Sequence, residues 1–126
     1  MGKNSVLLLD PLLDRAQETQ FLLQLASFRV VVVQNGDEAF NWIVSRIDST
    51  EKIDLLVVNH YQGEMPILSL LPELRKQNVQ LPVLFVDRTE KFACRMISEE
   101  QEAMFCCRAE NLLETVRSLF AKRVVT

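Results

Sequence analysis

Short apolar runs alternate with amphipathic segments along the whole chain. Within these runs, apolar and polar residues do not alternate, as they would in a strand with one solvent-exposed face. Continuous apolar runs are typical of strands that are buried on both faces of a parallel sheet. The predicted strands are 5–10, 29–33, 53–58, 83–86 and 104–107. The segments between them carry apolar residues at helical spacing, which predicts helices at 14–28, 37–47, 68–77, 90–102 and 110–122.

Polar residues mark where the first two helices begin. Asp14 is predicted as the N-cap of the first helix, and Asp37, after the Asn35-Gly36 break, as the N-cap of the second. Helical spacing assigns the inner faces. For the first helix they are Ala16, Leu22, Leu23, Leu25 and Ala26, and for the second Ala39, Phe40, Ile43, Val44 and Ile47.

Strands alternating with helices predict an α/β fold. We expect a doubly wound, five-stranded parallel sheet in the flavodoxin-like order 2-1-3-4-5, with about five helices. Residues 1–123 are predicted to form one domain, with 124–126 as a tail or the start of a linker.

Composition narrows the class of function. Of 126 residues, 48% are apolar and 25% charged, which excludes a disordered chain and a disulfide scaffold. The chain has a net charge of -3 and lacks the excess of Lys and Arg that is typical of a nucleic-acid-binding protein. The apolar runs are too short to cross a bilayer, and no signal peptide opens the chain.

We expect a cytoplasmic domain that contacts neither nucleic acid nor membrane. Its cysteines, Cys94, Cys106 and Cys107, are expected to be buried thiols.

Polar residues stand where the predicted strands end. In a doubly wound sheet the functional crevice lies beyond the carboxyl ends of the strands. The residues to inspect there are Asp10, Asn59, His60, Asp87 and Arg108.

Over nearly its whole length the chain resembles a receiver domain of a two-component response regulator. The resemblance rests on the strings at 6–10, 35–40, 54–58 and 81–86, taken in their order and spacing. It implies phosphoryl transfer to a carboxylate at the third strand tip, supported by Mg²⁺ held by oxygen ligands.

This sequence departs from that pattern at nearly every chemical position. The acidic pair after the first strand is Asp10-Pro11, and the phosphoacceptor position holds Asn59. A hydroxyl residue is replaced by Asp87, and the lysine after the fifth strand by Arg108. An amide is a poor nucleophile and a hard dication needs anionic oxygen, so we expect no phosphorylation there, weak or lost Mg²⁺ binding and no cofactor.

The same substitutions suggest a remnant switch pocket of Asp10, Pro11, Asn59, Asp87 and Arg108. One hypothesis is that an Asp87–Arg108 ion pair fixes the switch without phosphate; the alternative is two solvated charges that never meet.

A metal site is the weakest candidate. Asp10 could bind a metal together with His60 and Glu64, although a single His at a loop mouth is more often an ordinary polar residue. No glycine-rich phosphate loop or nucleophile–base set is present, so we do not expect an enzyme.

The favoured function is an atypical, phosphorylation-independent regulatory module in a response regulator, ahead of a transcriptional output domain in a longer chain.

The resemblance also implies a dimer through the face formed by helix 90–102, strand 104–107 and helix 110–122. The apolar side chains named for that face are Phe92, Met96, Leu112, Val116, Leu119 and Phe120. Their helical spacing places most of them in the core and leaves one or two for the surface. The alternatives are a phosphorelay receiver with another acceptor, for which Asp54 lies at the wrong strand end, and a small flavodoxin-like enzyme.

Overall fold

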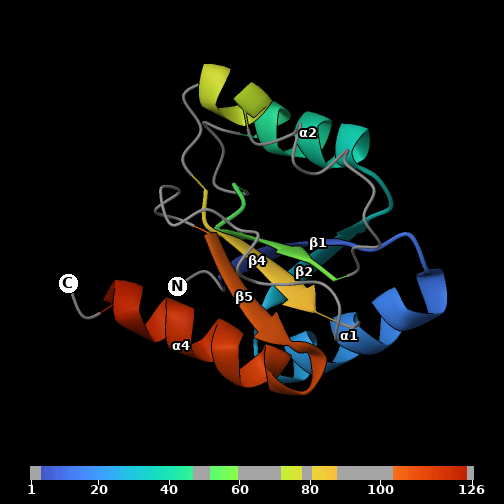
Figure 1. The fold of residues 1–126 in the computed structure, drawn as a ribbon, viewed down its shortest axis with the longest axis vertical. Coiled ribbons are helices and arrows are strands. Elements are labelled where there is room, and N and C mark those ends of the chain that lie inside the picture. Colours follow the sequence, from blue (N-terminus) through green and yellow to red (C-terminus); the bar gives the residue numbers. More distant parts are fainter. Residues whose placement is uncertain (1–3, 47–51, 60–71, 78–80, 88–103, 125–126) are drawn as a thin grey trace.

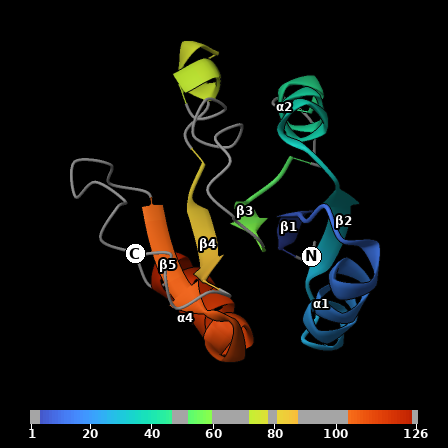
Figure 2. The same cartoon turned by 45° about the vertical axis from the view of Figure 1, so that its right-hand side comes forward.

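A five-stranded parallel sheet forms the centre of the molecule. The structure, a computed structural model, describes residues 4–46, 52–59, 72–77, 81–87 and 104–124. The strands are β1 (Ser5–Leu9), β2 (Arg29–Val33), β3 (Leu55–Val58), β4 (Val83–Asp87) and β5 (Met104–Arg108). Their order is β2-β1-β3-β4-β5, which Figure 2 shows along the sheet and which confirms the predicted fold class.

Helices cover both faces of this sheet (Figure 1). The helices are α1 (Leu13–Leu25), α2 (Gly36–Ser45), the short 3-10 helix η2 (Ala109–Asn111) and α4 (Leu112–Val124), and residues 72–76 are also helical. In Figure 1, α2 and the 72–76 helix lie on one face, and α1 and α4 lie on the other. The predicted helix 90–102 lies outside the described residues.

Each face of the sheet has its own apolar core, because successive strand residues point to opposite faces. Val6, Leu8 and Val57 pack toward α1 and α4, where the rings of Phe28 and Phe120 lie 5.2 Å apart. Leu7, Val58 and Phe85 pack on the α2 side. The continuous apolar runs of the sequence therefore do correspond to strands covered on both faces.

The predicted caps of the first two helices are wrong. α1 begins at Leu13 with Leu12 as its N-cap, and no side chain of the described residues caps the helix. The Leu12 N–H instead donates to Oδ1 of Asp10, so a buried acid before the helix replaces the cap. α2 begins at Gly36, and Asn35 accepts a hydrogen bond from the Glu38 N–H at 2.9 Å. Asp14 and Asp37 lie in the first turns of these helices.

The inner face of α1 also differs from the prediction. Ala16 and Leu23 are buried, but Leu22 and Leu25 are 51% and 67% exposed. Phe21 is exposed as well, so α1 carries apolar side chains on both sides and helical spacing could not select the buried one. The helix ends in a Schellman motif, in which Ser27 has φ 73° and the Phe28 N–H donates to the Leu23 carbonyl. None of the described helices is long and apolar enough to cross a membrane.

Candidate functional site

Asp10 and Asn59 follow β1 and β3, which are neighbouring strands, and the structure brings their side chains together. Both residues are fully buried. The Asp10 N–H donates to the Val33 carbonyl and the Asn59 N–H to the Leu9 carbonyl, both at 3.0 Å. These bonds extend the sheet ladder past the strand ends and fix where each side chain leaves the backbone.

The Asp10 carboxylate is held by Arg15, from the first turn of α1. Nη2 of Arg15 donates to Oδ1 at 2.6 Å and Nε donates to Oδ2 at 2.9 Å. The Arg15 side chain is 18% exposed and that of Asp10 is inaccessible. This two-pronged, charge-assisted geometry is the strongest form of a side-chain ion pair.

Asn59 turns its amide nitrogen toward this acid. Nδ2 donates to Oδ2 of Asp10 at 2.7 Å and to Oγ1 of Thr19 at 3.0 Å. Thr19 is buried and lies four residues after Arg15, so both project from the same side of α1. The cluster of Asp10, Arg15, Thr19 and Asn59, called the acidic corner below, thus ties α1 to two strand tips.

The electrostatics of the acidic corner favour an ionised Asp10. Burial by itself raises the pKa of this carboxyl. The hydrogen bonds from Arg15, Leu12 and Asn59, with the positive charge of Arg15, outweigh burial and hold the pKa below its ordinary value of 3.8. Asp10 is therefore a permanent anion at neutral pH.

These residues do not fit a Mg²⁺ ion. Magnesium requires several oxygen ligands in octahedral geometry, usually including one or two carboxylates. Here the Asp10 oxygens already accept N–H groups, and Asn59 presents a nitrogen rather than an oxygen to its neighbour. Among the described residues, no three His, Cys, Asp or Glu side chains gather where they could hold a metal. His60 and Glu64 lie outside the described part of the chain.

The tips of β4 and β5 form the other half of the predicted pocket. Asp87 and Arg108 are direct partners in the register of these strands. Nε of Arg108 lies 3.3 Å from Oε1 of Glu110, and both side chains are more than 60% exposed. The Asp87 side chain lies outside the described part, so its ion pair with Arg108 stays a prediction. Pro11 is exposed beside the acidic corner.

Three of the side chains named for the interaction face lie in the core, and the face itself stays a prediction. Leu112, Val116 and Phe120 are buried at 6%, 0% and 7% exposure, in the core between α4 and the sheet. They line the core rather than the surface, as helical spacing predicts for most of the set. Leu119 is half-buried, and Phe92 and Met96 lie outside the described residues.

Sequence reasoning missed Arg15 and Thr19. Their signal was a basic and a hydroxyl residue four positions apart, on the same side of the predicted helix as the buried Ala16 and Leu23. Polar residues on a buried face need partners, and the buried ends of β1 and β3 supply them.

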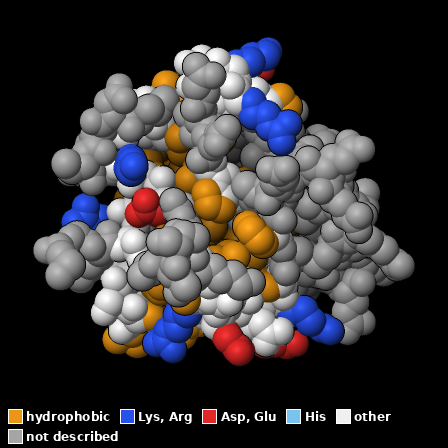
Figure 3. All heavy atoms as spheres, turned by 90° about the vertical axis from the view of Figure 1, so that its left-hand side faces the viewer, with side chains coloured by type: hydrophobic (Ala, Val, Ile, Leu, Met, Phe, Trp, Pro, Cys, Tyr) orange, Lys and Arg blue, Asp and Glu red, His pale blue; other side chains and the backbone are white. Residues whose placement is uncertain are grey.

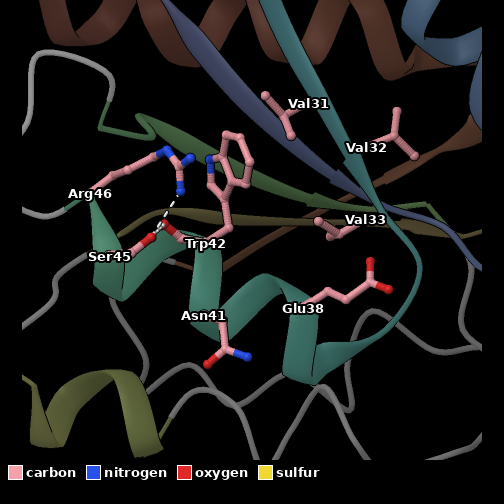
Figure 4. Close-up of a pocket in the computed structure, with 8 residues that line it drawn as sticks. All are labelled: Val31, Val32, Val33, Glu38, Asn41, Trp42, Ser45 and Arg46. Carbon is pink, nitrogen blue, oxygen red and sulfur yellow. Dashed lines mark hydrogen bonds between the residues drawn. The ribbon is translucent and has the colours of Figure 1, made fainter.

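A shallow depression of about 530 Å³ lies between β2 and α2 (Figure 4). In it the Arg46 guanidinium lies 3.4 Å from the ring centre of Trp42 and donates to Ser45 Oγ at 2.8 Å. The Trp42 Nε1 is buried and has no hydrogen-bond partner in the part of the chain that the structure describes. The other lining residues are Val31, Val32, Val33, Glu38 and Asn41. Among the described residues of this lining there is no His or Cys.

No protein-family model and no curated protein matches the sequence. Solved structures do match its fold. The receiver domain of Francisella response regulator 1452 is 20% identical, with a TM-score of 0.73 over 96% of this chain and 99% of that one. A response regulator receiver domain protein from Clostridium thermocellum is 15% identical, with a TM-score of 0.75 over 98% of this chain and 99% of that one.

The Vibrio cholerae chemotaxis protein CheY4 is 18% identical, with a TM-score of 0.74 over 93% of this chain and 98% of that one. The structural neighbours are thus receiver domains, and the chain has their fold, as the resemblance predicted.

Proposed function

We propose that the chain is a regulatory module of a two-component signalling system that works without phosphoryl transfer at the β3 tip, and that it is not an enzyme. The receiver fold supports the signalling role. The single observation that carries the rest is Asn59, whose buried amide donates to Asp10 and Thr19. An amide held in this way is neither a nucleophile nor accessible to a phosphodonor.

A different phosphoacceptor has little support. Asp54 precedes β3, at the amino edge of the sheet, and its Oδ2 accepts the Ser5 N–H at 2.9 Å. The Asp54 N–H in turn donates to the Ser5 carbonyl. This carboxylate therefore accepts a hydrogen bond from the start of β1, at the edge of the sheet opposite to the acidic corner.

The proposal includes no direct contact with nucleic acid. On the face drawn in Figure 3, the described Lys and Arg side chains lie apart around the rim rather than in one stripe. A nucleic-acid surface needs clustered positive charge to neutralise successive phosphates. A transcriptional output would then belong to another domain of a longer chain.

An amide NMR titration of the protein with Mg²⁺ and beryllofluoride, a phosphoryl mimic, tests this function. We expect the amide peaks of Asp10, Asn59 and Arg108 to stay in place. The matched control is Asn59→Asp, which restores a carboxylate at the β3 tip. A concerted shift of these peaks in the wild-type protein would overturn the proposal.

We further propose a homodimer through the face of β5 and α4. Phe105 on β5 is 36% exposed, and Leu113 and Leu119 on α4 are partly buried against the core. Sedimentation equilibrium of wild type, Phe105→Ser and Asp87→Thr tests this face. Phe105→Ser should weaken the dimer about tenfold; an unchanged constant in Asp87→Thr would remove the Asp87–Arg108 pair from the proposal.

A further inference from the structure

The charge of Asp10 is balanced from within the protein. Its carboxylate is buried, and an unpaired buried anion would be strongly unfavourable. The Arg15 guanidinium, which contacts both carboxylate oxygens, provides the compensating positive charge. We infer that Arg15 is the resident cation of the acidic corner and keeps divalent metal ions out of it. This inference rests on the proposed function, since it concerns the same site.

The geometry explains how Arg15 would exclude a metal. A divalent ion needs direct contact with carboxylate lone pairs at about 2.0–2.6 Å. Arg15 donates one N–H to each oxygen of Asp10, at 2.6 and 2.9 Å, so the guanidinium lies across the approach to both. A metal ion would have to break both bonds and displace a cation that is only 18% exposed.

The neighbours of Asp10 reinforce this arrangement. Oδ1 also accepts the Leu12 N–H, and Oδ2 also accepts the Asn59 amide. Thr19, one turn after Arg15, accepts the same amide. Displacing Arg15 would therefore also disturb the contacts that hold α1 over the strand tips, which gives Arg15 a positioning role for α1.

A second carboxylate at position 59 makes the inference measurable. Nδ2 of Asn59 lies 2.7 Å from Oδ2 of Asp10, so Asn59→Asp places two carboxylates side by side. With Arg15 present, one of these negative charges is balanced. In Asn59→Asp/Arg15→Gln both carboxylates face each other without the guanidinium, which is the arrangement that attracts a divalent cation.

The experiment compares Mg²⁺ affinity, by calorimetry, and Tb³⁺ luminescence in these two variants. We expect Asn59→Asp/Arg15→Gln to bind at least tenfold more tightly than Asn59→Asp. The matched control is Asn59→Asp/Arg117→Gln, which removes an equal charge from an exposed position on α4. It should bind like Asn59→Asp, because an exposed distant charge is screened by solvent.

Equal affinities in the three variants would overturn the inference. If the Arg15→Gln variant fails to fold, as judged by circular dichroism, Asn59→Asp/Arg15→Lys replaces it. Lys keeps the charge but loses the two-pronged fork, so a smaller rise in affinity is expected and no rise would overturn the inference.

The wild-type beryllofluoride titration separates the two claims. A response there removes the proposed function. A silent wild type, combined with equal metal affinities in the variants, removes only the role of Arg15.

Discussion

The ion pairs at the two halves of the carboxyl edge differ in geometry, in the distance between the charged atoms and in exposure to solvent. Asp10–Arg15, at β1, is two-pronged at 2.6 and 2.9 Å, with side chains 0% and 18% exposed. The Arg108–Glu110 pair, at the end of β5, joins Nε to Oε1 at 3.3 Å, and its side chains are 62% and 71% exposed. Solvent screens the second pair but hardly the first. The buried pair therefore fixes the β1–β3 half of the edge by its electrostatics, whereas the exposed Arg108–Glu110 pair contributes little to the β5 half.

Removing the acid of the fixed half should have the largest effect. Asp10→Ala removes the carboxylate that accepts hydrogen bonds from Arg15, Asn59 and the Leu12 N–H. Breaking a buried pair in this way costs about 3–5 kcal/mol, and we expect the lower end because Arg15 reaches solvent. Urea unfolding measures the loss. Exposed Asp14→Ala is the control and should change stability little; a loss below about 1 kcal/mol in Asp10→Ala would contradict the comparison.

Lowering the pH should remove the contribution of ionised Asp10 to the stability of the wild-type protein. The folded pKa of Asp10 is lowered, so near that pKa the unfolded chain binds more protons than the folded one. The stabilisation is present above the ordinary pKa of 3.8 and is lost as the pH falls through the folded value. The stability difference between wild type and Asp10→Asn, measured by urea unfolding, should therefore shrink below about pH 4. A constant difference down to pH 2 would contradict it.

Thr19→Val tests the hydroxyl of the acidic corner. The variant keeps the shape of the side chain but removes the acceptor of the Asn59 amide at 3.0 Å. A loss of about 1 kcal/mol is expected for one buried hydrogen bond between neutral groups. Thr19→Ser retains the hydroxyl and separates this loss from that of the methyl group. An unchanged free energy of unfolding in Thr19→Val would show that the hydroxyl does not stabilise the fold.

The smallest effect belongs to the exposed half. Glu110→Gln removes the carboxylate beside Arg108 and should change the free energy of unfolding by less than about 0.5 kcal/mol. The midpoint of urea unfolding at low and high salt measures it. A loss above about 1 kcal/mol would contradict the expectation that the exposed pair contributes little.

The sequence predicted the sheet well because each strand is built on a short continuous apolar run. Such runs are typical of strands that are buried on both faces of a sheet. Asp10 and Asn59 followed from the same logic, since carboxyl ends of parallel strands share an edge. Arg15 did not, because the partner of a buried acid depends on the angle at which α1 leaves β1. Leu22 and Leu25 were misplaced because α1 is apolar on both sides.

β1 lies between β2 and β3, and its ladder is completed at the tip by the Asp10 and Asn59 N–H groups. Amide protons in such a position exchange with solvent only when the surrounding sheet opens. In deuterated water, the β1 amides should thus be among the last to exchange, at a rate that reports global unfolding. Because Arg15 contacts Asp10 from α1, truncating Arg15 should accelerate exchange in β1 and in the first turn of α1 together.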